Sequence, residues 1–136
     1  MNKSKGFTII ELIVVIAIIA VLATIVLVNV TSYINKGKDA SIKGNMANMM
    51  TIAASVYDDT GAYTTVGSNA AYSAGKTSIE TANGAATVVE GIATSAWCFQ
   101  TALLSEPGVT YCVDSTGYKG TTAVSCDATG DCATDT

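Results

Sequence analysis

The chain has 136 residues, a length that fits one domain. It contains no arginine and no histidine, and seven lysines against eleven acidic residues give a formal net charge of −4 at pH 7. An acidic chain without arginine argues against a surface built to bind phosphates, so we expect no nucleic-acid partner.

The first predicted element is an apolar helix over residues 7–30. Its central part, residues 12–28, contains no charged residue and a single polar one, Thr24. At about 1.5 Å per residue the helix would measure roughly 36 Å, enough to cross a hydrocarbon core of about 30 Å. Lys3 and Lys5 precede it, which favours a single-pass helix in the cytoplasmic membrane with its N-terminus inside.

A plain membrane anchor explains this helix but not the residues at its start. Glu11 is the only acidic residue before Asp39, and a carboxylate at mid-helix in hydrocarbon costs about 3 kcal/mol. The apolar run is also too long for an ordinary cleaved secretory signal, and no small-residue cleavage site follows it. The abrupt Gly6-Phe7 junction is a second feature that an anchor leaves unexplained.

Residues 5–12, KGFTIIEL, resemble the start of the type IV pilins, whose precursors carry a short basic leader that ends in glycine. The resemblance implies that a prepilin peptidase cuts between Gly6 and Phe7, and that the new amine of Phe7 is then methylated. It also implies that, in a filament, the Glu11 carboxylate of one subunit meets the Phe7 ammonium of its neighbour. Since breaking a poorly solvated ion pair is strongly unfavourable, this pair would fix the register between subunits.

Apolar residues recur at three- and four-residue steps over residues 31–60 and predict an amphipathic continuation of the helix. Polar residues, Asp39 among them, are expected on its other positions, and Gly61 is expected to cap its end. The residues expected on the apolar face are Val30, Tyr33, Ile34, Ile42, Met46, Met49, Ala53, Val56 and Tyr57.

The long helix has few points at which it could break. Residues 7–36 contain neither proline nor glycine, so we expect an unbroken helix at least over residues 12–33 in an assembled filament. Any bend is expected at Gly37 or Gly44.

Residues 61–136 predict a small head in an α+β, pilin-like fold. Residues 61–94 are interpreted as loop-rich, with a short helix near residues 79–89. Residues 97–104 and 109–113 predict two strands of an antiparallel hairpin around the turn at Pro107-Gly108. We expect this hairpin to form part of a sheet of two or three strands that packs on the amphipathic helix.

Cys98, Cys112, Cys126 and Cys132 all lie in the head. An even count in a small domain beyond a membrane favours two disulfides, and a zinc site would need closely spaced cysteine pairs or histidines. We favour Cys98–Cys112, which would join the two strands, and Cys126–Cys132, which would close a short loop. The cross-pairings remain open.

The sequence offers no strong metal, cofactor or catalytic site. Residues 127–131 are only faintly similar to a calcium loop, because the oxygen-ligand spacing and terminal glutamate of an EF-hand are missing. No histidine or lone activated cysteine is present. We therefore expect no metal, no cofactor and no enzymatic activity.

The main hypothesis is a structural subunit of a type IV pilus. Its partners would be copies of itself, the prepilin peptidase, the pilus assembly machinery and, before assembly, the membrane; assembly would place it in an extracellular filament. The alternatives are a pseudopilin of a type II secretion or DNA-uptake system, and a monomeric signal-anchored surface protein. Gly6-Phe7 and Glu11 argue against the last alternative, whereas the sequence separates the first two poorly.

Overall fold

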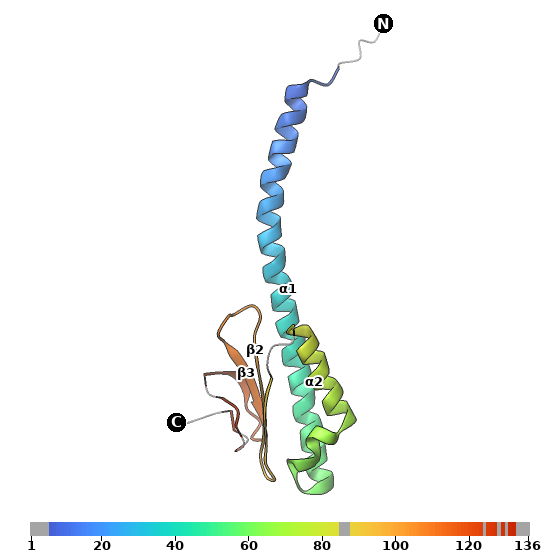
Figure 1. The fold of residues 1–136 in the computed structure, drawn as a ribbon, viewed down its shortest axis with the longest axis vertical. Coiled ribbons are helices and arrows are strands. Elements are labelled where there is room, and N and C mark those ends of the chain that lie inside the picture. The colour runs from blue at the N-terminus through green and yellow to red at the C-terminus, as the bar shows by residue number, and fades with distance from the viewer. Residues whose placement is uncertain (1–5, 85–87, 124, 128, 130, 133–136) are drawn as a thin grey trace. The chain divides into compact units, whose positions relative to one another are not determined.

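The computed structural model describes residues 6–84, 88–123, 125–127, 129 and 131–132. Helix α1 (Ile9–Thr60) is followed by a short 3-10 helix, η1 (Tyr63–Ser68), and by helix α2 (Ala70–Ala82). Four strands complete the order: β1 (Val89–Ile92), β2 (Trp97–Ala102), β3 (Thr110–Asp114) and β4 (Lys119–Thr122). The α+β, pilin-like fold class is therefore confirmed (Figure 1). The chain divides into two units, residues 1–34 and 35–136, which are described separately.

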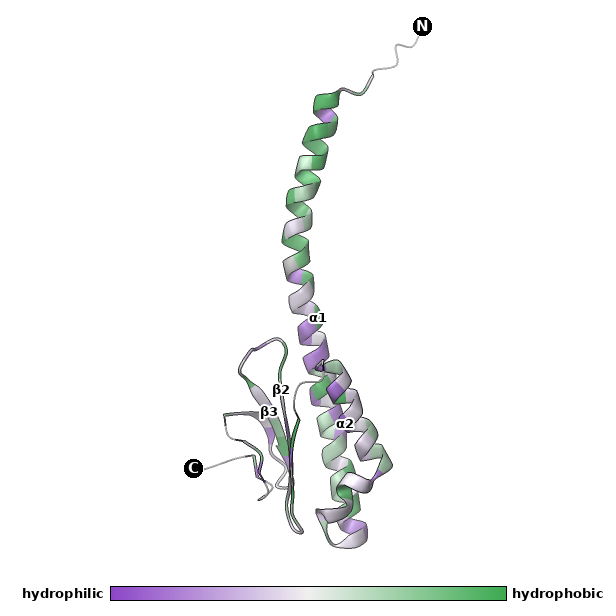
Figure 2. Cartoon of the chain, viewed as in Figure 1, coloured by the Kyte–Doolittle hydropathy of each residue, from purple (hydrophilic) through white to green (hydrophobic). Residues whose placement is uncertain are grey.

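The unit formed by residues 1–34 consists of the apolar part of α1. Figure 2 shows that hydrophobic residues dominate this stretch. Its large apolar side chains are exposed on all sides of the helix; Leu22, for example, has 56% of its surface exposed. Among the described residues, α1 is the one helix long and apolar enough to cross a membrane.

The unit formed by residues 35–136 is organised around the second part of α1. Ile42, Met46, Met49, Ala53 and Val56 are buried at spacings of three and four residues, so this part of the predicted apolar face is confirmed. The prediction is wrong for its other large members, Val30, Tyr33, Ile34 and Tyr57, which are exposed. The helix ends where the sequence predicts, because Gly61 adopts a φ of 73° and its N–H bonds the Tyr57 carbonyl at 2.7 Å.

Asp39 is a correction to the predicted solvent face of α1. It is only 3% exposed, and its carboxylate accepts hydrogen bonds from the backbone N–H groups of Leu104 and Ser105, at 2.7 and 2.9 Å, and from the Ser105 hydroxyl. Burial alone would raise the pKa of Asp39, but these three bonds and nearby Lys43 outweigh it, so the pKa lies below its ordinary value. Asp39 thus ties the segment after β2 to α1.

Helix α2 begins nine residues before the expected short helix, and β1 begins where that helix was expected to end. The Asn69 side chain starts α2 by accepting hydrogen bonds from the N–H groups of Ala71 and Tyr72, at 2.9 and 3.1 Å. Small residues conceal the helical period in this stretch, since only Tyr72 and Ile79 are buried. The interpretation of residues 61–94 as largely loop was therefore wrong.

The sheet is an antiparallel meander in the order β1-β2-β3-β4, one strand more than the largest sheet expected. Both predicted strands are present, within two residues of their expected ends. Its inner face carries Trp97, Phe99 and Val113, which share one core with the buried face of α1 and with Tyr72 and Ile79 of α2.

The outer face of the sheet is covered rather than exposed to solvent. Five of the six residues of β2 are buried, including residues on both of its faces. A second buried cluster lies here, and it consists of Cys98, Cys112, Cys126 and Cys132.

Candidate processing, assembly and disulfide sites

The predicted cleavage junction lies just before α1. Gly6 and Phe7 are outside regular secondary structure, and the helix begins two residues later at Ile9. Both residues are exposed, and Phe7 has 74% of its surface exposed. The described residues of the junction are therefore exposed and lie outside the helix.

Thr8 and Glu11 form a reciprocal cap at the start of α1. The Glu11 Oε2 atom accepts hydrogen bonds from the Thr8 N–H at 2.8 Å and from the Thr8 hydroxyl at 2.7 Å, and the Glu11 N–H donates to Thr8 Oγ1 at 3.3 Å. This is the capping-box pattern of threonine followed three residues later by glutamate. No hydrogen bond from the described residues reaches Glu11 Oε1, so that oxygen can accept a donor from elsewhere.

The few polar side chains in the apolar stretch bond to the backbone of their own helix. The Thr24 hydroxyl donates to the Ala20 carbonyl at 3.0 Å, and Asn29 Nδ2 donates to the Ile25 carbonyl at 3.1 Å. Such internal bonds lower the cost of placing these groups in hydrocarbon or against another helix.

The four cysteines form two disulfides, Cys98–Cys126 and Cys112–Cys132, in place of the favoured pairs. The sheet register explains why Cys98 and Cys112 do not pair. Cys98 lies opposite Asp114 and Cys112 opposite Gln100, so the two cysteines are diagonal neighbours rather than direct partners across the strands. Each bridge instead connects one strand to the C-terminal segment, the part of the chain after β4 that carries Cys126 and Cys132.

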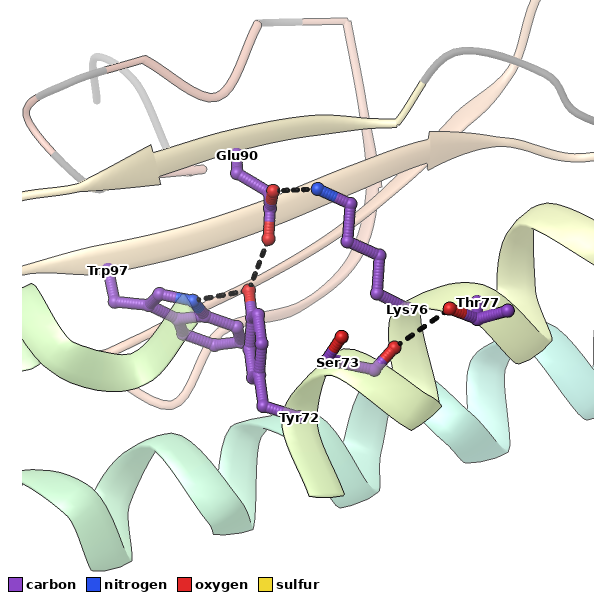
Figure 3. A network of polar contacts seen from close by, with 6 residues as sticks. All are labelled: Tyr72, Ser73, Lys76, Thr77, Glu90 and Trp97. Carbon is purple, nitrogen blue, oxygen red and sulfur yellow. Dashed lines mark hydrogen bonds and ion pairs between the residues drawn. The ribbon is translucent and has the colours of Figure 1, made fainter. Parts of the chain in front are cut away.

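A partly buried polar network lies between α2 and the sheet (Figure 3). Trp97 Nε1 donates to the Tyr72 hydroxyl at 2.8 Å, the Tyr72 hydroxyl donates to Glu90 at 2.8 Å, and Glu90 also pairs with Lys76. Burial raises the pKa of Tyr72 well above its ordinary range, so this phenol remains protonated and keeps donating. The network joins α2, β1 and β2, and its chemistry is that of a structural link.

The calcium-like stretch has little metal-binding character in the residues that can be described. The Asp127 carboxylate accepts hydrogen bonds from the Thr129 N–H at 2.7 Å and from its hydroxyl at 2.5 Å. Across the described parts of the chain, no group of three or more acidic, cysteine or histidine residues could hold a metal ion. Residues 128 and 130 lie outside the described residues.

Comparison with protein families finds one match, over residues 1–27, to the prokaryotic N-terminal methylation motif. This motif is a class III signal peptide typical of type IV prepilins, and it implies processing by a prepilin peptidase and assembly into pili. It fits membrane anchoring by the N-terminal helix before assembly, and it suggests a structural protein rather than an enzyme. No curated protein and no solved structure matches the chain.

Proposed function

We propose that this protein is a structural subunit of a type IV pilus. Residues 1–6 are a leader, and residues 7–30 hold the precursor in the cytoplasmic membrane with its N-terminus inside. Cleavage after Gly6 frees the Phe7 amine, and the subunit then joins an extracellular filament. The observation that carries this proposal is a methylation motif over residues 1–27 that includes the start of an apolar helix, whose large side chains are exposed.

The contacts of Glu11 support assembly rather than simple anchoring. Both hydrogen bonds from Thr8 end on Oε2, and Oε1 has no partner among the described residues. The Phe7 ammonium of a neighbouring subunit is a donor of the right charge for this position. In a poorly solvated helix bundle such a pair selects one register, whereas apolar packing alone would let the helices slide.

The remaining residues suit the outside of a filament. The apolar face of residues 42–56 is used within the head, so it does not compete with the apolar helix for neighbouring subunits. The head, residues 61–136, contains both disulfides, which are typical of proteins outside the cytoplasm.

The test is to shear filaments from cells and measure the mass of their subunit. We expect a chain that begins at Phe7, with a methylated amine, as the main component. Gly6→Asp should keep the leader attached and abolish filaments. A mature chain that begins at Met1 would contradict the proposal, and a processed chain in the membrane without surface filaments would favour a pseudopilin instead.

A second experiment distinguishes a defect in filament assembly from a defect in leader cleavage. Glu11→Ala should leave insertion and cleavage intact but make filaments rare, because the carboxylate for the Phe7 amine is removed. Glu106→Ala, which removes an exposed carboxylate from the head, is the matched control and should leave filament yield unchanged. Equal filament yields from the two variants would show that Glu11 has no role in assembly.

A further inference from the structure

The outer face of the sheet pairs each cysteine with a hydrogen-bond acceptor on the same strand. Strand β2 carries Cys98 and Gln100, and β3 carries Cys112 and Asp114. Residues two apart on a strand point to the same face, so all four side chains lie on the outer face. The register places Cys98 opposite Asp114 and Gln100 opposite Cys112, so cysteines and acceptors alternate around a square of four residues.

The C-terminal segment makes one disulfide and one backbone hydrogen bond to each of the two strands. Cys126 bonds through its sulfur to Cys98, and its N–H donates to Gln100 Oε1 at 2.7 Å. Cys132 bonds through its sulfur to Cys112, and its N–H donates to Asp114 Oδ2 at 3.0 Å. Each incoming cysteine is therefore held by the sulfur and the acceptor of a single strand.

Both acceptors are buried, and other bonds orient them. Gln100 is 5% exposed, and its Nε2 donates to Thr110 Oγ1 at 2.8 Å, which directs Oε1 towards Cys126. Asp114 is fully buried, and its Oδ1 accepts from the N–H and hydroxyl of Thr116 and from the Tyr118 N–H. Those bonds are made within β3 and its turn, so Oδ2 is positioned without help from the C-terminal segment.

Close backbone approach at β1 completes the docking surface. Gly91 lies opposite Cys98, and a Cβ atom at this position would sit 1.5 Å from the Asp127 carbonyl oxygen and 2.8 Å from Cys98 Sγ. A side chain here would thus block the segment that brings Cys126 to Cys98.

We propose that Gln100 and Asp114 select the disulfide pairing of this protein. Four thiols allow three pairings, and thiols alone do not distinguish one strand from the other. Docking of the Cys126 N–H on Gln100 places its thiol at Cys98, and docking of the Cys132 N–H on Asp114 places its thiol at Cys112. This role does not depend on filament assembly.

Each bridge then closes by thiol–disulfide exchange with a disulfide oxidant such as glutathione disulfide. A cysteine thiolate attacks the oxidant and releases one glutathione thiolate, and the docked partner thiolate displaces the second. Per bridge, two protein thiols lose two electrons and two protons, and one glutathione disulfide becomes two glutathione thiols.

The test is oxidative refolding of the full chain in detergent, from the reduced and unfolded state, in a glutathione redox buffer. Digestion at acidic residues separates all four cysteines, because Glu106, Asp114, Asp127 and Asp131 lie between them. Mass spectrometry without reduction then counts each pairing. We expect Cys98–Cys126 and Cys112–Cys132 to predominate in the unmodified protein.

Gln100→Met removes the acceptor for Cys126 while keeping a side chain of similar length. The ratio of Cys98–Cys126 to the other pairs of Cys126 should fall roughly three- to tenfold, the factor expected for one net hydrogen bond. Gln100→Glu keeps an acceptor oxygen and should retain most of the native pairing. Asp114→Asn should shift the pairs of Cys132 in the same way.

Thr101→Val is the matched control for a weakened sheet. Thr101 is a buried residue of β2 next to Gln100 but on the inner face, and the substitution removes the bond that it accepts from Asn83 Nδ2 at 2.9 Å. Gln100 and its bonds to Thr110 and Cys126 stay in place, so we expect near-native pairing in this variant. Native pairing in Gln100→Met, or equal losses in Gln100→Met and Thr101→Val, would overturn the proposal, because pairing would then not depend on the acceptor.

Discussion

Asp39 couples the stability of the head to pH. Its folded-state pKa lies below the ordinary value of 3.8, so the ionised form is favoured by folding. The stability that Asp39 provides is therefore fully present above about pH 4. It is lost as the pH falls through the lower folded-state pKa.

Asp39→Asn should lower the free energy of unfolding at neutral pH by about 1.5 to 3 kcal/mol, the range for hydrogen bonds to a charged group. It should also weaken the dependence of stability on pH below 4. Denaturant unfolding in detergent, with the disulfides intact, can be followed by fluorescence of Trp97, the only tryptophan, which is fully buried.

Asp59→Asn is the control for this measurement, because Asp59 is an exposed carboxylate on the same helix. It should change the unfolding free energy by less than about 0.5 kcal/mol. Equal effects of the two variants would show that the bonds to Leu104 and Ser105 do not stabilise the head.

Residues differ in how far the sequence reveals their role. Gly6, Phe7 and Glu11 stand out because their order is unusual at the start of an apolar helix. The bond between Thr8 and Glu11 could have been predicted from the T-x-x-E spacing alone. Gln100 and Asp114 could not, since their partners are 26 and 18 residues away along the chain.

At the scale of elements, the sequence of α1 predicts where the helix stays continuous in an assembled filament. Residues 7–36 contain no residue that breaks a helix, and an unpaired backbone group in an apolar bundle would be costly. We therefore expect residues 12–33 to remain helical after assembly, with any bend at Gly37 or Gly44. A filament map at side-chain resolution measures this directly.

A non-helical stretch between residues 20 and 30 in that map would contradict the prediction. It would mean that packing between subunits, rather than local sequence, decides where the helix melts. The internal bonds of Thr24 and Asn29 to backbone carbonyls mark the places where such melting would begin, since bonds of this kind compete with the helix.

The elements differ in how clearly their sequence shows them. Helix α1 and the hairpin of β2 and β3 were predicted, because large apolar residues recur there with the period of a helix or lie in short runs. The helix expected near residues 79–89 was placed too late in the chain, because α2 has few large apolar residues. Strands β1 and β4 were missed, and β4 reads KGTT, which contains no large apolar residue. Its strand structure depends on pairing with β3, a contact that local sequence does not encode.

At the scale of the whole molecule, the two disulfide loops overlap. The loop closed by Cys98–Cys126 contains Cys112, and the loop closed by Cys112–Cys132 contains Cys126. Every peptide bond between Cys98 and Cys132 is consequently spanned by at least one bridge, and those between Cys112 and Cys126 are spanned by both. The favoured pairs of the sequence analysis would have left the latter stretch unspanned.

Overlapping loops should make the head tolerant of proteases, which act on any protein displayed outside a cell. Lys119 is exposed and is the only lysine after Lys76, so a lysine-specific protease cuts once within the doubly spanned stretch. Complete digestion without reduction should yield peptides 77–119 and 120–136 as one covalent species that separates only after reduction. Two free peptides before reduction would contradict the overlapping arrangement. A subunit cut at Lys119 would thus keep its whole C-terminal segment, and one broken peptide bond would not shed this part of the surface.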